Sequence, residues 1–294
     1  MNKYLIFRTD RVGDFLVTAI LLKSIKENDS TAHISVIGSI KNSAYIKTFP
    51  FVDNVIQLDN NFLSKIKVFF KVFKFKYKSI IIHDNKRRSK FISYFLKSTN
   101  KIDISDFKDN THIEIIKNIL QKMEFNFSNK ALNILSHRNP KNISYEKNQI
   151  QLHFDEKWIF NDYIKKFINI EPTENELINF IKQIVKKKEK KLIITTGVNF
   201  PDKMNRIENE LKELKIRLHK NLDFLELEKI TSQSNLLISC HGAISHIAAA
   251  YNIKQIDIID KTYNYNRWTN HFRNYNYLYR DNFSELSRRI LNLI

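Results

Sequence analysis

Short apolar runs alternate with longer amphipathic stretches along most of this 294-residue chain. A short apolar run is typical of a strand buried on both faces, whereas an amphipathic stretch is typical of a surface helix. The alternation therefore predicts parallel sheets covered by helices on both faces. The predicted strands are Tyr4–Phe7, His33–Ile37, Asn54–Leu58, Ser79–His83, Ile102–Ile104, Gln149–His153, Lys191–Thr195, Ile216–Leu218, Leu236–Ser239 and Gln255–Ile259.

The polar region Ser128–Asn148 interrupts this alternation and is predicted to link two α/β halves. Ligands of such halves bind beyond the carboxyl ends of the strands. The predicted helices are Asp14–Glu27, Asn42–Thr48, Phe62–Tyr77, Lys86–Leu96, Thr111–Met123, Trp158–Phe167, Asn175–Lys187, Asp202–Leu214, Phe224–Ser232, Ser245–Tyr251 and Phe283–Ile294.

The charge balance favours an anionic partner. Lysine and arginine outnumber aspartate and glutamate by 49 to 31, which suits nucleic acid, anionic lipid or a phosphorylated small molecule. The single cysteine, Cys240, excludes an internal disulfide and a cysteine-based zinc site. The run Tyr4–Phe7 is too short for a signal peptide, and no run reaches the roughly 18 apolar residues of a membrane span, so we expect a cytoplasmic protein.

The first strand–helix junction is Arg8–Asp14. Gly13 would allow a tight turn with positive φ or the close approach of a ligand. Asp14 would cap the free N–H groups of the following helix. Alternatively, its carboxylate would act as a general base, kept ionised by the helix dipole. The pattern alone leaves both interpretations of Asp14 open.

A second junction, Ser239–Ala250, joins a strand to a helix of small residues through Gly242. The N–H groups at the start of that helix suit a pyrophosphate. His246 would donate to a phosphate oxygen or simply pack or cap the helix. Asp202, which follows Gly197, would contact a nucleotide ribose or cap its own helix.

Basic residues gather in two places in the first half. Lysines and aromatic residues mix through Lys65–Lys78, where Ile66, Phe69, Phe70 and Phe73 would form a buried stripe at helical spacing. The lysines outside that stripe would form a solvated face or would attract an anionic membrane.

The triplet Lys86, Arg87 and Arg88 would bind the carboxylate or phosphate of an acidic acceptor, or would be ordinary surface charge. In the second half, Arg267 and Arg280 lie in a late aromatic stretch and would either meet phosphate or pack the crossover between domains. Nucleic-acid binding is the main non-enzymatic alternative, although the sequence has no zinc finger, RNA-recognition signature or basic zipper.

A series of segments has the same order and spacing as the signature segments of one known family. They are Gly13–Leu22, Phe49–Ile56, Tyr77–Asp84, His112–Leu120, Leu192–Gly197, Asn221–Ile230 and His246–Ala250. Together they resemble glycosyltransferase family 9, the lipopolysaccharide heptosyltransferases.

The resemblance implies a GT-B architecture, in which two Rossmann-like domains with parallel sheets face a central cleft. It implies an acceptor domain over residues 1–146, a nucleotide-sugar domain over 147–272, and a final helix over 273–294 that crosses back to the first domain. The implied reaction is an inverting transfer that needs no metal and no cofactor besides the nucleotide sugar, ADP-heptose or another. The acceptor would be a lipopolysaccharide or surface glycan, and the enzyme would lie peripherally on the inner face of the cell membrane, with no nucleic acid as partner.

The resemblance also assigns roles to residues. Asp14 matches the proposed general base of the family, and Lys157 matches the lysine that contacts the donor phosphates. The expected acceptor-binding residues are Arg11, Gly13, Lys86, Arg87 and Arg88. The expected donor-binding residues are Lys157, Gly197, Asp202, His241, Gly242, Ala243 and His246.

One departure from the family pattern affects the donor site. Where the family has aspartate, threonine and glycine, this chain has His241, Gly242 and Ala243. The loss of the acid implies a different donor, a rebuilt contact or a catalytically inert GT-B-like scaffold.

Overall fold

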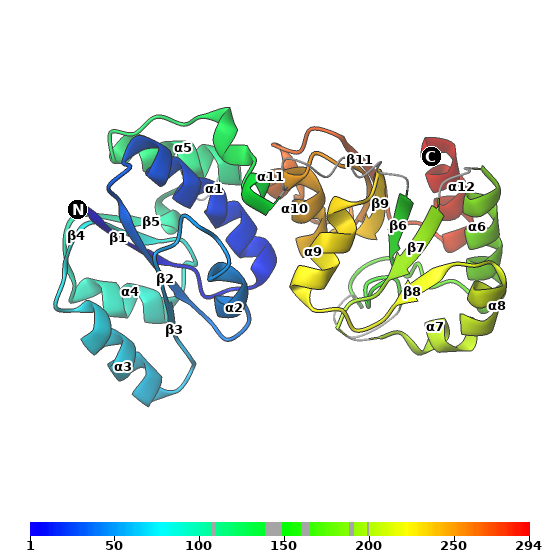
Figure 1. The fold of residues 1–294 in the computed structure, drawn as a ribbon, viewed down its shortest axis with the longest axis horizontal. Helices are drawn as coiled ribbons and strands as arrows, with labels where there is room; N and C mark the ends of the chain where they lie inside the picture. Colours follow the sequence, from blue (N-terminus) through cyan, green and yellow to red (C-terminus); the bar gives the residue numbers. More distant parts are fainter. Residues whose placement is uncertain (108–109, 139–148, 160–164, 188–190, 199) are drawn as a thin grey trace. The chain divides into compact units, whose positions relative to one another are not determined.

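The computed structural model describes residues 1–107, 110–138, 149–159, 165–187, 191–198 and 200–294 (Figure 1). The chain divides into two compact units. Unit 1 comprises Met1–Asn139 and Asn266–His271, and unit 2 comprises Pro140–Tyr265 and Phe272–Ile294. Each unit contains one parallel sheet, so the fold class predicted from the alternation is confirmed.

Unit 1 has a five-stranded sheet in the order β3-β2-β1-β4-β5. Its strands are β1 (Lys3–Phe7), β2 (His33–Gly38), β3 (Asn54–Gln57), β4 (Lys76–Ile82) and β5 (Lys97–Asp103). Its helices are α1 (Val12–Asn28), α2 (Ser43–Ile46), α3 (Phe62–Val72), α4 (Arg87–Tyr94), α5 (His112–Lys122) and α11 (Asn266–Thr269), with short 3-10 helices at Ile104–Phe107, Asn129–Leu132 and Ser136–Arg138.

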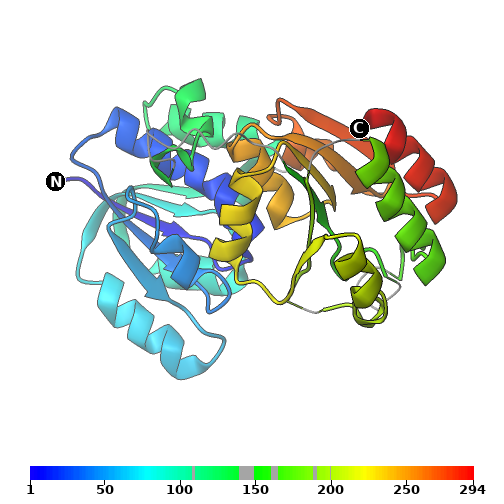
Figure 2. The same ribbon diagram turned by 45° about the vertical axis from the view of Figure 1, so that its right-hand side comes forward.

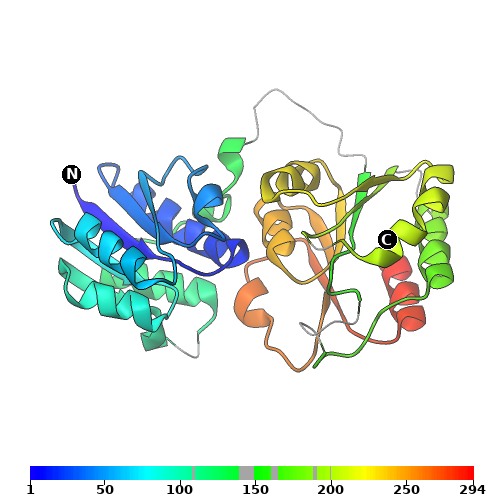
Figure 3. The same ribbon diagram turned by 90° about the horizontal axis from the view of Figure 1, so that it is seen from below.

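The two faces of the unit 1 sheet carry different helices (Figures 1 and 3). On one face, Val68 and Val72 of α3 and Ile92 of α4 pack with Leu5 and Phe7 of β1. On the other face lie α1 and α5, which contact each other. Such two-sided burial accounts for the uninterrupted apolar runs of the central strands.

Unit 2 has a six-stranded sheet in the order β11-β10-β9-β6-β7-β8. Its strands are β6 (Gln149–His153), β7 (Lys191–Thr195), β8 (Arg217–His219), β9 (Leu236–Cys240), β10 (Lys254–Ile259) and β11 (Tyr275–Tyr279). Its helices are α6 (Glu174–Lys187), α7 (Asp202–Arg206), α8 (Glu208–Glu213), α9 (Phe224–Ser232), α10 (Ala243–Ala250) and α12 (Phe283–Leu293).

Helices lie on both faces of the unit 2 sheet (Figure 2), and two separate cores hold them there. Helices α6, α7, α8 and α12 share one core with the sheet, and α9 and α10 share another with Leu237 and Ile253. At the start of α9, Asp223 accepts hydrogen bonds from the N–H groups of Leu225 and Glu226, which fixes where the helix begins.

In both sheets the chain winds outwards first to one side and then to the other. The first strands of the two units, β1 and β6, are central, and the winding reverses between β1 and β4 and between β6 and β9. At such a switch point the loops that follow the two strands diverge and leave room for a ligand. The fold therefore specifies one candidate site in each unit.

The final helix does not return to unit 1 as expected. Leu286 and Ile290 of α12 are fully buried in the core that α6 forms with the unit 2 sheet. Instead, the segment Asn266–His271 belongs to unit 1, where the rings of Trp268 and His112 lie 3.9 Å apart. The expected boundary at residues 146 and 147 lies outside the described residues.

Several predicted elements differ in extent. The helix predicted over Phe62–Tyr77 ends at Val72. From Phe75 onwards apolar residues alternate with lysines at the period of a strand, and β4 begins at Lys76. The same period was overlooked in β11, where tyrosines alternate.

Two further helices were overextended. The helix predicted over Asp202–Leu214 breaks at Ile207 into α7 and α8. In the helix predicted over Trp158–Phe167, Trp158, Ile159 and residues 165–167 form bends and turns, and 160–164 lie outside the described residues.

Most of the buried stripe predicted on α3 is also wrong. Val68 and Val72 face the sheet and Phe69 packs partly against the same core, whereas Ile66, Phe70 and Phe73 are exposed. Among the described residues, no helix combines the length and apolar composition needed to cross a bilayer.

Candidate functional site

The switch point of unit 1 is built on a buried arginine. Arg8 follows β1 and is 3% exposed; His83 follows β4 and is fully buried. Arg8 Nη2 lies 2.9 Å from His83 Nδ1, and Arg8 Nε donates to Thr18 Oγ1 at 2.6 Å. Because arginine only donates, Nδ1 of His83 accepts this bond. Burial and the nearby Arg8 hold the pKa of His83 well below its usual value, so the ring is neutral.

A second set of hydrogen bonds fixes the loop after β4. Asp84 Oδ2 accepts from Thr9 Oγ1 at 2.6 Å and from Ser89 Oγ at 2.8 Å, while Oδ1 accepts from the N–H of Lys86 at 3.2 Å. Asp84 therefore joins the end of β1 to the start of α4. These hydrogen bonds fix the backbone from which Lys86 and its neighbours extend their side chains.

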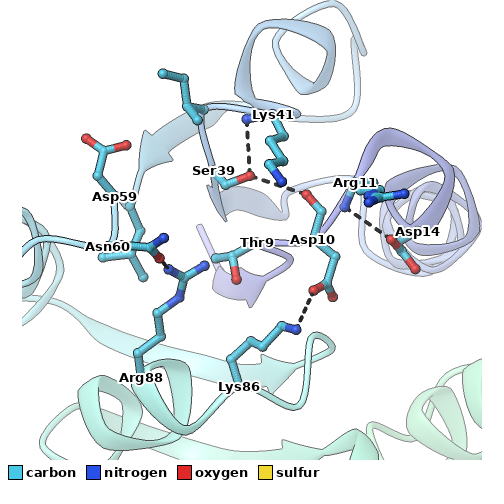
Figure 4. A pocket seen from close by; sticks show the side chains of 12 residues that line it. Thr9, Asp10, Arg11, Asp14, Ser39, Lys41, Asp59, Asn60, Lys86 and Arg88 are labelled. Carbon is cyan, nitrogen blue, oxygen red and sulfur yellow. Dashed lines mark hydrogen bonds and ion pairs between the residues drawn. The ribbon is translucent and has the colours of Figure 1, made fainter. Parts of the chain in front are cut away.

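A pocket of about 580 Å³ opens beyond these strand ends (Figure 4). Lys41 approaches it from the loop after β2, and Lys86 and Arg88 approach from the start of α4 on the opposite side. Lys86 Nζ lies 3.0 Å from Asp10 Oδ1, and Arg88 donates to the Asn60 side chain. The charged lining residues are Asp10, Arg11, Asp14, Lys41, Asp59, Lys86 and Arg88.

Asp14 lies in the first turn of α1 and lines this pocket. Its Oδ2 accepts a hydrogen bond from the N–H of Arg11 at 3.1 Å, so it also caps the helix. The two interpretations of Asp14 are therefore compatible in position, because the same carboxylate is both a cap and part of the pocket wall.

The predicted acceptor residues are only partly brought together. Arg11, Lys86 and Arg88 line the pocket, whereas Arg87 is an exposed residue that does not line it. Gly13 lies inside α1, and none of the described glycines has a positive φ, so the turn predicted there is wrong. The helix already begins after the extended residue Arg11, which has φ −91° and ψ 174°.

Sequence reasoning missed Lys41 and Asp10 as pocket residues. Both follow strands whose ends had been predicted correctly, so inspection of every residue after a strand would have found them.

The switch point of unit 2 contains a buried ion pair. Lys157, in the loop after β6, places Nζ 2.5 Å from Asp155 Oδ2, and the two side chains are 18% and 4% exposed. Burial acts to lower the pKa of Lys157, but the attraction of Asp155 outweighs it and raises that pKa. Burial acts to raise the pKa of Asp155, but Lys157 outweighs it and lowers that pKa. Both groups therefore remain charged at neutral pH.

The same lysine lies against the loop after β9. A methyl group placed on Gly242 would come within 2.7 Å of Lys157 Nζ, so glycine is required for this approach. Gly197 is also close, because a methyl group there would lie 3.0 Å from Glu156 Oε2. The structure thus places Gly242 against Lys157 and Gly197 beside the neighbouring residues Asp155 and Glu156.

Asp257 of β10 holds the loop that contains His241. This carboxylate is fully buried and lies 2.7 Å from His241 Nδ1. It also accepts from Ser245 Oγ at 2.9 Å and from the Tyr275 hydroxyl at 3.2 Å. Because a carboxylate only accepts, Nδ1 of His241 carries the hydrogen. The sequence signal that was missed was an acid within the apolar run predicted as a strand.

The start of α10 leaves two amides without a protein acceptor. The N–H of Gly242 donates to Ser245 Oγ at 3.2 Å, and the N–H of Ser245 donates to the carbonyl of Gly242. Within the described residues, the amides of Ala243 and Ile244 donate to no protein oxygen. They point along the axis of an eight-residue helix and form a place for an anion.

His246 packs against other rings, and Asp202 lies at the start of a helix. The His246 ring is buried and packs 5.6 Å from His241 and 5.3 Å from Phe272. Asp202 begins α7 with an exposed side chain, and among the described residues it makes no hydrogen bond to Lys157 or Gly242.

Arg280 supports the site instead of facing a ligand. It is 4% exposed and donates to the carbonyl oxygens of Lys157 and Ile168, each at 2.8 Å. The side chain thereby fixes the backbone that carries Lys157. Arg267 lies in α11 and belongs to unit 1.

Comparison with known proteins identifies the architecture. The E. coli heptosyltransferase WaaC with ADP superposes with a TM-score of 0.73 and 11% identity, covering 99% of this chain and all of that chain. The glycosyltransferase family 9 structure from Veillonella parvula gives 0.71 and 12%, covering 99% and 91%. The chain has the GT-B fold.

The fold is shared beyond those transferases. A putative UDP-N-acetylglucosamine 2-epimerase from Listeria monocytogenes gives a TM-score of 0.60 at 11% identity, covering 99% of this chain and 87% of that chain. No family model and no curated protein matches the sequence. At these identities the likenesses establish the GT-B fold, and function depends on the site.

Proposed function

We propose that this protein is a glycosyltransferase that takes a sugar from a nucleoside diphosphate sugar and transfers it to an anionic glycan acceptor. Unit 2 binds the donor and unit 1 binds the acceptor. The position of Lys157 Nζ against Gly242, next to the start of α10, is the observation that carries the proposal. A cation and two unused amides at a switch point suit a diphosphate.

The donor site works by charge. As the bond between the sugar and the diphosphate breaks, negative charge grows on the departing phosphate oxygen. Lys157 and the amides of Ala243 and Ile244 stabilise that charge, so the proposed transfer proceeds without a metal. His241 takes the place of the aspartate found in family 9. An aspartate carboxylate only accepts hydrogen bonds, whereas the free ring nitrogen of His241, Nε2, either accepts or donates one.

The acceptor site supplies the base. The acceptor hydroxyl oxygen attacks the anomeric carbon from the side opposite the diphosphate, and the nucleoside diphosphate leaves with the bonding electrons. Asp14 takes the hydroxyl proton once the sugar has become cation-like, because a carboxylate is a weak base towards an alcohol. Lys86 and Arg88 then bind acidic groups of the acceptor. The product is an inverted glycoside.

A test of this proposal starts with binding. ADP, UDP, GDP and their sugar conjugates at millimolar concentration should raise the melting temperature if one of them fits unit 2. Transfer or hydrolysis of the stabilising nucleotide sugar should then persist in EDTA.

The catalytic step is tested with Asp14→Asn. Asparagine keeps the helix cap, so the melting temperature should remain close to that of the wild type. Transfer should fall by about a thousandfold. Asp59→Asn, which changes another pocket carboxylate, is the matched control and should retain activity. Full turnover in Asp14→Asn removes Asp14 from the mechanism, and binding without turnover in the wild type indicates an inert scaffold.

A further inference from the structure

One surface of unit 1 exposes an unusual number of large apolar side chains. Phe62, Leu63 and Phe70 of α3 are 73%, 67% and 62% exposed, and Phe91 and Tyr94 of α4 are 67% and 77% exposed. The group formed by Phe62, Leu63, Ile66, Phe70, Phe73, Phe91, Tyr94 and Phe95 is called the aromatic face below. Large apolar groups gathered in this way mark an interaction surface.

Ring contacts show that the aromatic face is continuous across two helices. Phe69 lies 5.3 Å from Phe73 and 6.2 Å from Phe95, which follows α4. Phe95 in turn lies 5.3 Å from Phe91 and 5.2 Å from Tyr94. Helices α3 and α4 lie side by side (Figure 3), and their exposed aromatic side chains therefore form one surface.

The charge around the aromatic face has one sign. Residues 60–102 contain 12 lysines and arginines and a single acidic residue, Asp84. Asp84 is 6% exposed and is bonded to Thr9 and Ser89, so it does not offset the surface charge. Lys67, Lys71 and Lys74 are exposed beside the aromatic residues of α3.

We propose that the aromatic face docks on the surface of an anionic lipid bilayer. Aromatic rings insert at the boundary between headgroups and acyl chains, and lysines reach the headgroup phosphates with their long stems. An anionic bilayer satisfies both properties together, because the rings need an apolar layer and the lysines need a negative surface.

The docking surface adjoins the unit 1 pocket. Asn60 lines the pocket two residues before α3 begins, and Lys86 and Arg88 line it on either side of the first residue of α4. A bilayer against α3 and α4 thus lies near the pocket mouth. If the proposed function holds, the acceptor is a lipid-linked glycan delivered from that bilayer. The docking itself does not depend on the transferase activity.

Vesicle binding of the full chain tests the docking. The wild type should cosediment with vesicles of phosphatidylglycerol and phosphatidylcholine in equal parts, and should bind phosphatidylcholine vesicles at least about tenfold more weakly. The triple variant Phe70→Ser, Phe91→Ser, Tyr94→Ser should lose binding about tenfold or more. The control Leu225→Ser, Tyr277→Ser, Tyr279→Ser removes exposed apolar groups of unit 2 and should bind as the wild type does.

Variants that remove lysines measure the contribution of charge to vesicle binding separately from that of the aromatic rings. Each lysine near an anionic surface strengthens binding about fivefold, so Lys67→Gln, Lys71→Gln, Lys74→Gln together should weaken it about a hundredfold. The control Lys47→Gln, Lys182→Gln, Lys229→Gln removes the same charge from exposed positions elsewhere and should have little effect.

The outcomes decide between distinct explanations. Equal binding by the aromatic-face variant and the wild type overturns the proposal. So does sedimentation of the wild type as a dimer that the aromatic variant dissociates, because the face would then join two copies of the chain. Neither vesicle assay contains a nucleotide sugar, and nucleotide-dependent thermal shifts measured on the same variants report separately on the proposed function.

Discussion

The two switch points have the same topology but opposite electrostatic designs. In unit 2, Lys157 is paired with the buried Asp155, and His241 is held by the buried Asp257. In unit 1, the buried groups beneath the pocket are Arg8, neutral histidines and Asp84, whose carboxylate is held by hydroxyl and amide groups instead of a cation, while the carboxylates of Asp10, Asp14 and Asp59 line the pocket itself. Unit 2 thus holds its functional cation rigidly before a ligand arrives, whereas unit 1 presents several charged groups to a pocket that a ligand must organise.

This difference between the units suits one ligand of constant structure and one of variable structure. A diphosphate is small and constant, so a fixed cation and two fixed amides recognise it at low entropic cost. A glycan acceptor is larger and more variable, and adaptable side chains such as Lys41, Lys86 and Arg88 accommodate it. Changes of pH or of single residues should therefore affect the two units differently.

Mild acid should separate the units most strongly. Burial is the largest cause that lowers the pKa of His83, and it lowers those of His112 to about 3 and His271 to about 4, all in unit 1. Unfolded histidine titrates near 6.5, so the unfolded chain binds more protons as pH falls below that value. His112 alone should cost unit 1 about 2.5 kcal/mol between pH 7 and 4.5, and His271 should cost about the same. His83 adds to this loss in the same direction.

Unit 2 should lose less over that range. Burial lowers the pKa of its His153 to about 4, and the pKa of the half-buried His219 is lowered as well. Each unit has one tryptophan, Trp158 in unit 2 and Trp268 in unit 1. Urea unfolding of Trp158→Phe and of Trp268→Phe at both pH values therefore reports each unit separately. Equal losses in both units would remove the asymmetry assigned to the buried histidines.

Removal of Lys157 should have the next largest effect. Lys157→Ala leaves Asp155 buried without its partner and should lower the free energy of unfolding of unit 2 by about 3 kcal/mol. Nucleotide-dependent stabilisation should disappear as well.

Lys220→Ala is the matched control for that variant. It breaks an ion pair with Glu208 of the same 2.5 Å length, but its partners are about one-third exposed, so it should cost less than about 1 kcal/mol. Urea titrations followed by Trp158 measure both variants. Similar losses would mean that the Lys157 pair is no more buried in solution than a surface pair.

The smallest effect should come from a single methyl group. Gly242→Ala displaces Lys157 Nζ, which is the flexible end of a side chain, so it should cost less than about 1 kcal/mol of stability but weaken nucleotide binding several-fold. Gly38→Ala places its methyl 2.8 Å from Asn42 and Ser43 in unit 1, and should destabilise that unit without changing nucleotide affinity. Calorimetric titration with the stabilising nucleotide checks both, and unchanged affinity in Gly242→Ala contradicts the assigned contact.

The sequence predicted the central strands well because burial on both faces leaves an uninterrupted apolar run, as in β1 and β9. It failed at the sheet edge. Tyr275, Tyr277 and Tyr279 alternate along β11 like any half-exposed strand, yet polar residues between them obscured the signal. The helix predicted over Phe62–Tyr77 failed for a related reason, since an apolar–lysine mixture fits either period over a few residues.

The family resemblance anticipated part of the candidate site in unit 2. Lys157 and Gly242 were chosen as donor residues from a family resemblance, and the structure places them together. Asp257 was not predicted, because its role depends on His241, Ser245 and Tyr275, which the fold alone brings to it. The exposure of the aromatic face was not predictable either, since a stripe of Phe residues on a helix usually faces a core.

The path of the chain through α11 has a consequence for biosynthesis. Trp268 covers His112 in unit 1, and the Asn270 side chain donates to Thr111 Oγ1 at the start of α5, yet both residues are translated after most of unit 2. The amino-terminal half therefore emerges from the ribosome lacking one of its own pieces. Unit 1 becomes complete only near the end of translation, shortly before unit 2, whose last segment is Phe272–Ile294.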